Sequence, residues 1–95
     1  MLYRIASAAA QPNHKVVITW SDGVTASVDL GPAIETGPVF AAMRDGAWFA
    51  ANMRVAPDRL GLEWPNNIDF SADGLRFRAF PETPEAEFAG SSQNA

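Results

Sequence analysis

Two carboxylates flank a tryptophan–proline turn late in the chain, and they have the clearest potential for chemistry. Glu63 and Asp69 lie on either side of Trp64, and Asn66 lies in the turn itself. Two carboxylates in one cleft can divide the roles of acid and base when their environments differ. Together with Asp22, the same groups could also bind a small ligand. Because nothing in the sequence indicates a cleft, two solvated carboxylates remain the competing interpretation.

The other reactive residue types favour no catalytic, metal or nucleotide site. The chain has no cysteine, which excludes disulfides, thiolate metal sites and a cysteine nucleophile. The single histidine, His14, lies in a Pro-Asn-His-Lys stretch typical of a surface turn. Residues 69–74 resemble the first half of an EF-hand loop, with Ser71 in place of one ligand, but Phe80 stands where the loop requires a bidentate Glu. We therefore expect no metal and no cofactor.

The charge pattern of the sequence indicates which partners, nucleic acid or membrane, the protein can bind. The net charge is −4, and among seven basic residues only Arg76 and Arg78 lie close together. Nucleic-acid binding usually needs a clustered basic face, so we expect this domain alone to bind no nucleic acid. The acidity and the lack of a long apolar run also argue against a membrane partner. The apolar stretch at the start of the chain is too short for a signal peptide and is interrupted by polar Ser7. We therefore expect a cytoplasmic protein.

Alternation and turn signals predict the elements that must position these groups. The clearest is a hairpin of Lys15–Trp20 and residues 24–30 around Asp22-Gly23, a pair that suits a tight turn. Residues 71–80 fit either a helical turn capped by Ser71 or a final strand, and Gly74 favours the helical turn. The other expected elements are strands at 2–10, 47–55, 62–64 and 68–70, a helical turn or loop at 34–38, and a short helix at 39–43 that ends at Arg44-Asp45-Gly46.

These elements make one domain over residues 1–80 of the α+β class. We expect a small, mostly antiparallel sheet of about five strands with one or two short helices. Residues 81–95 are rich in Pro, Glu, Ser and Ala and are predicted to form a disordered acidic tail. Trp20 and Trp64 each end a strand, where a large ring most often closes the core, although Trp is also enriched at partner-facing hot spots.

Five landmarks in fixed order resemble a known family over roughly residues 2–80. They are Trp20-Ser21-Asp22-Gly23, Val28-Asp29-Leu30, Gly37-Pro38-Val39-Phe40, Phe49, and Glu63-Trp64-Pro65-Asn66-Asn67-Ile68-Asp69. The order is similar to that of the small bacterial domain-of-unknown-function family 2442. Asn67 departs from the family pattern, which usually has Gly there. The resemblance assigns no role to Trp64, Asn66 or Asp69. Some relatives resemble the first half of a two-domain protein whose second half is a helix-turn-helix DNA binder.

The leading functional hypothesis is a non-catalytic protein–protein interaction module that binds another small protein or itself. A small sheet leaves strand edges that need cover, and an acidic surface suits a basic partner. The resemblance implies a further possibility, an antitoxin-like member of a two-gene pair. The alternative is a small-ligand-binding protein or enzyme that uses Asp22, Glu63, Asn66 and Asp69 near Trp64. A third hypothesis is a homodimer formed by pairing of edge strands.

Overall fold

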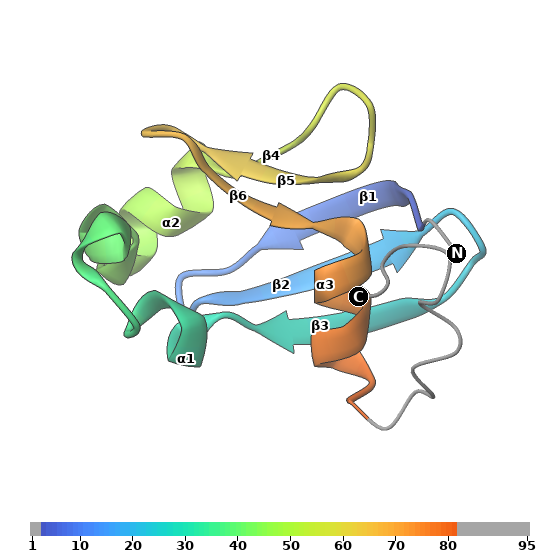
Figure 1. Ribbon diagram of the computed structural model, residues 1–95, viewed down its shortest axis with the longest axis horizontal. Helices are drawn as coiled ribbons and strands as arrows, with labels where there is room; N and C mark the ends of the chain where they lie inside the picture. The colour runs from blue at the N-terminus through green and yellow to red at the C-terminus, as the bar shows by residue number, and fades with distance from the viewer. Residues whose placement is uncertain (1–2, 82–95) are drawn as a thin grey trace.

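The chain folds into two small sheets flanked by short helices, which confirms the α+β class. The computed structural model describes residues 3–81. The strands form two three-stranded antiparallel sheets, ordered β1-β2-β3 and β4-β5-β6, in place of one sheet of about five strands. Figure 1 shows the sheets one above the other, with α3 in front of β3 and the other helices gathered at one end. The predicted tail at 81–95 lies outside the described residues except for Pro81.

The first sheet is built from consecutive hairpins. It comprises β1 (Ile5–Ala10), β2 (Lys15–Trp20) and β3 (Thr25–Asp29), each antiparallel to the next. Gly23, in the turn between β2 and β3, has a φ of 91°, which glycine adopts without steric cost. The single turn α1 (Gly31–Ile34) follows β3. The predicted hairpin and its turn are therefore confirmed.

One predicted strand is wrong, because residues 47–55 form helix α2 (Gly46–Asn52) and the short strand β4 (Arg54–Val55). The carboxylate of Asp45 begins α2: it accepts hydrogen bonds from the backbone N–H groups of Ala47 at 3.0 Å and Trp48 at 3.2 Å. Asp45 thus caps a new helix directly after the preceding one, the 3-10 helix η1 (Pro38–Arg44). Periodicity could not separate strand from helix here, because most residues of this segment are apolar.

The second sheet ends in the last helix. Strands β5 (Gly61–Trp64) and β6 (Ile68–Ser71) form a hairpin, and β4 pairs with the other side of β5. Helix α3 (Ala72–Ala79) follows β6 directly. The Ser71 hydroxyl accepts a hydrogen bond from the Gly74 N–H at 3.0 Å, which is the expected cap. The helical alternative for residues 71–80 is therefore correct.

Arg59 joins the two sheets. Its backbone carbonyl accepts a hydrogen bond from the Ile5 N–H at 2.8 Å, and its guanidinium donates to the carbonyls of Ile5 at 3.2 Å and Ala6 at 2.9 Å. These contacts fall at an irregularity in the β1–β2 register between Ile5 and Ser7. Arg59 has a φ of 63°, which costs a non-glycine residue about 1–2 kcal/mol, so these hydrogen bonds help to hold it.

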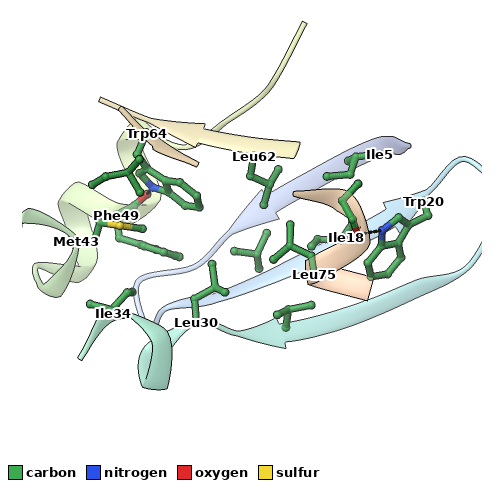
Figure 2. Packing of buried hydrophobic residues seen from close by; sticks show 14 of the residues in the cluster. Ile5, Ile18, Trp20, Leu30, Ile34, Met43, Phe49, Leu62, Trp64 and Leu75 are labelled. Atoms are coloured by element: carbon green, nitrogen blue, oxygen red, sulfur yellow. Dashed lines mark hydrogen bonds between the residues drawn. The ribbon is translucent and has the colours of Figure 1, made fainter. Parts of the chain in front are cut away.

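A hydrophobic cluster lies between the sheets and contains both strand-ending tryptophans (Figure 2). Trp20 is 0% exposed and Trp64 is 4% exposed. Each indole N–H also has an acceptor inside the protein: Trp20 donates to the Ala72 carbonyl at 3.2 Å and Trp64 to the Phe49 carbonyl at 2.9 Å. Buried tryptophans commonly find such partners. The core interpretation of both residues is therefore confirmed.

Candidate functional site

The turn between β5 and β6 carries the predicted site residue Asn66 and its neighbour Asn67. Both have left-handed backbone conformations, with φ values of 73° and 62°. Asparagine adopts this conformation more readily than most residues, so Asn67 replaces glycine at modest cost. Both side chains are exposed. The turn therefore presents two amides to solvent.

The two predicted carboxylates lie beside this turn. Glu63 on β5 and Asp69 on β6 are direct cross-strand partners. Arg54 on β4 forms an ion pair with Glu63, with Nη2 at 2.8 Å and Nε at 2.9 Å from Oε1. A depression of about 400 Å³, open to solvent, is lined by these three residues and Asn66. Such a surface can bind a polar or cationic group, but it does not exclude water as a site for acid–base chemistry would.

The other two predicted site residues lie elsewhere. Trp64 points into the core (Figure 2) and is only 4% exposed, so it mainly supports the turn. Asp22 lies in the β2–β3 turn, at the opposite end of the molecule from the β5–β6 turn (Figure 1). The structure thus brings Glu63, Asn66 and Asp69 together, and Asp22 does not belong to that cluster.

Asp22 instead ties α3 to the first sheet. Its Oδ2 lies 3.1 Å from Nη1 of Arg76, whose side chain is only 12% exposed. The guanidinium lies over the rings of Tyr3, at 4.4 Å from the centroid, and Trp20, at 5.1 Å. A cation held against aromatic faces needs a nearby anion when it is largely desolvated. Asp22 is therefore part of the framework.

The hydrogen bonds of β3 show which side of this strand is free. The Trp20 N–H donates to the Val24 carbonyl, and the Leu30 N–H donates to the His14 carbonyl, each at 2.9 Å. Both pairs follow the β2–β3 register, so the even-numbered residues of β3 form the ladder with β2. In an antiparallel ladder the intervening residues direct their N–H and C=O groups to the other side.

Those intervening residues are Thr25, Ser27 and Asp29, and their backbone groups are termed the β3 edge below. No other residue of 3–81 forms a hydrogen bond to these backbone groups. Their side chains are exposed. Sequence reasoning missed these residues, because it predicted the strand but not that β3 would end the sheet. The break after the strand, at Gly31-Pro32, was the available signal.

Between residues 3 and 81, no three His, Asp or Glu side chains cluster as metal ligands would. None of the helices in that range has the length and apolar character needed to cross a bilayer. His14 is half-buried in the β1–β2 turn, with its ring edge-on to Phe49 at 5.2 Å between centroids.

The fold recurs in a solved structure. The chain is similar to a "putative DNA binding protein", NE0471 from Nitrosomonas europaea, with a TM-score of 0.75 and 23% sequence identity. The similarity covers 86% of this chain and 52% of that chain, so this chain spans about half its length. Our expectation of no nucleic-acid partner is corrected by this likeness, because the same fold occurs in a protein named for DNA binding. Scattered basic residues were too weak a reason for that exclusion.

Sequence comparison gives the family. No protein with curated annotation matches the sequence significantly. The family described as "Protein of unknown function (DUF2442)" matches residues 5–81. This span runs from β1 to α3 and includes all the landmarks of the resemblance. The chain therefore belongs to the DUF2442 family.

Proposed function

We propose that this domain is a non-catalytic protein-interaction module that accepts an extended segment of a protein partner along the β3 edge. The observation that carries the proposal is the row of backbone groups at Thr25, Ser27 and Asp29 that have no hydrogen-bond partner within residues 3–81. Addition of a strand to a free sheet edge is a recurrent mode of peptide recognition, in which main-chain hydrogen bonds supply affinity.

The composition of β3 supports this reading. Natural proteins usually protect an edge strand with Lys, Pro, a bulge or an overlying element. β3 contains neither Lys nor Pro, and its register with β2 is regular over the whole strand. The outer side chains of Thr25 and Ser27 are small, whereas helix α3 packs against β3 from one face of the sheet (Figure 1). Asp29 supplies the one charge, and it lies at the end of the strand.

The fold comparison suggests a setting for such a module. The solved relative is named for DNA binding, and this chain matches about half of it. By analogy, an interaction domain within a longer DNA-binding protein would bring protein partners to DNA. A bacterial cytoplasmic location fits this setting and the absence of cysteine. The antitoxin-like role stays a prediction from the family resemblance.

Site-specific photocrosslinking in the native host tests the proposal. A benzoylphenylalanine at position 27 should give a protein adduct, whereas the same residue at Ser7 should not. Ser7 is exposed and lies on the same face of the sheet as Ser27, because it is opposite Thr19, which is opposite Thr25 on β3. Mass spectrometry then identifies the adduct, whether a different protein or a second copy of this chain. No adduct at position 27, or equal adducts at positions 27 and 7, would reject the β3 edge as the binding surface.

The open depression beside the β5–β6 turn favours a second candidate function, binding of a small polar ligand. Glu63 is neutralised by Arg54, but within residues 3–81 the side chains of Asp69 and Asn66 form no ion pair or hydrogen bond, and both line the same depression. A polyamine such as spermidine is a suitable probe, because its ammonium groups complement exposed carboxylates. Saturable NMR shift changes confined to Asn66 and Asp69 would support this candidate, and an unchanged spectrum at millimolar spermidine would reject it.

A further inference from the structure

We infer that the partner at the β3 edge is β3 of a second copy of this chain, related to the first by a two-fold axis. The two sheets β1-β2-β3 would then join into one continuous sheet. This inference names the occupant of the edge and rests on the function proposed above. The register that the strand's own sequence allows supports this occupant.

A two-fold axis through Ser27 uses every free backbone group of the edge. In an antiparallel pair about this axis, Ser27 faces Ser27 of the second copy, and Thr25 faces Asp29 of the second copy. Each of these residues directs its N–H and C=O outward, so each pair exchanges two backbone hydrogen bonds. About six hydrogen bonds would join the two strands.

The side chains are complementary in the same register. At the axis two small serine hydroxyls meet, and at each end the hydroxyl of Thr25 lies opposite the carboxylate of Asp29, so no like charges oppose each other. On the inner face, which α3 also packs against, half-buried Ala26 would lie opposite buried Val28 of the second copy, so no polar group opposes it there. A register centred on Asp29 would instead bring two carboxylates together and leave Thr25 without a partner.

The short edge limits the strength of this dimer. A pair of five-residue strands buries less area than the roughly 1,200–2,000 Å² of a standard stable interface. We therefore expect a dissociation constant of roughly 10–1,000 μM, which is typical of weak association. The association should be visible at high protein concentration or wherever the chain is held at high local concentration.

The test uses the full chain and a charge swap at the axis. In sedimentation equilibrium, the apparent mass of wild type should rise from 10.2 kDa toward twice that value as the concentration rises from micromolar to millimolar. The control Ser27→Thr should behave in the same way. Ser27→Lys and Ser27→Glu each place like charges face to face at the axis. Each alone should bind itself at least about tenfold more weakly, and an equimolar mixture should recover association. Ser27 is exposed, so both variants should fold, which circular dichroism checks.

A disulfide provides an independent measurement if a charged variant misfolds. Since the chain has no cysteine, Ser27→Cys introduces a single thiol on the axis, where the expected Cα separation of about 5.5 Å permits a disulfide. Oxidation should give a dimer rapidly for Ser27→Cys and slowly for the control Ser7→Cys. Equal rates would overturn the inference.

The outcomes also separate this inference from the proposed function. Wild type that stays at 10.2 kDa at millimolar concentration, or charge variants that associate as wild type does, overturn the second copy as partner. If wild type is monomeric but position 27 crosslinks to a different protein, the proposed function survives and only this inference fails. If wild type is monomeric and position 27 gives no adduct, both fail.

Discussion

Replacing Gly46 by alanine should destabilise this protein, even though alanine is the better helix former. Gly46 is the first residue of α2 and packs against the β1–β2 turn. A Cβ atom at this position would lie 2.0 Å from the carbonyl oxygen of Pro12. Because the obstacle is backbone, no side-chain rotation can relieve the clash. The helix and the turn must therefore move apart.

The size of the effect follows from that distance. A carbon and a carbonyl oxygen need about 3.3 Å, so the two segments would have to separate by about 1.3 Å. Overpacking of this kind costs about 1–3 kcal/mol, and the rigid backbone contact at Gly46 favours the upper end. The gain in helix propensity is at most about 1 kcal/mol. We expect a net loss of about 2 kcal/mol, a large part of a total stability of about 5–14 kcal/mol.

Urea denaturation followed by the fluorescence of the buried tryptophans measures this loss. With a slope of about 1–1.5 kcal/mol per molar urea, the midpoint should fall by about 1–2 M. Gly37→Ala is the matched control, because Gly37 has an extended φ of −174° and a Cβ there meets nothing within 4 Å. The control should be neutral or slightly stabilising. A Gly46→Ala midpoint equal to that of wild type would refute the close-contact argument.

Substitutions at three further positions test individual contacts by the same urea assay. Asp22→Asn should lower the free energy of unfolding by about 1–2 kcal/mol, because Arg76 loses its anion. This loss should be smaller in 1 M salt, and a loss independent of salt would contradict the ion-pair explanation. Asp45→Ala should lower the free energy of unfolding by about 1 kcal/mol through loss of the α2 cap, and Asp45→Asn should keep most of the wild-type stability. Equal stability of wild type and both variants would argue against a capping role. Glu63→Gln should change stability by less than about 0.5 kcal/mol, because its partner Arg54 is 70% exposed; a loss above about 1 kcal/mol would show that this pair is structural.

Local signals account for the elements that were predicted correctly. Asp22-Gly23 between two alternating segments predicts a hairpin, since the turn chemistry and the strand pattern agree. Ser71 before a short polar stretch predicts a helix cap. The failure at 47–55 has the opposite cause. Its apolar residues carry no period, and Asp45 can end one helix or begin the next, so the choice depends on packing against the β1–β2 turn.

The candidate site was predictable only in part. Glu63, Asn66 and Asp69 are close in sequence around one turn, so their proximity follows from a hairpin alone. Asp22 lies far from them in sequence, and nothing local indicates that it faces Arg76 at the other end of the molecule. A pairing across fifty-four positions is a property of the packed fold.

Local chemistry in the sequence was therefore enough to establish the family landmarks and the hairpins, and to favour burial of both tryptophans. These depend on turn residues, on alternation and on the size of apolar side chains. Strand order, the junction made by Arg59 and the free side of β3 depend on contacts between distant segments. A strand's sequence specifies which face is apolar, but only its neighbours in space decide which of its backbone groups remain unpaired.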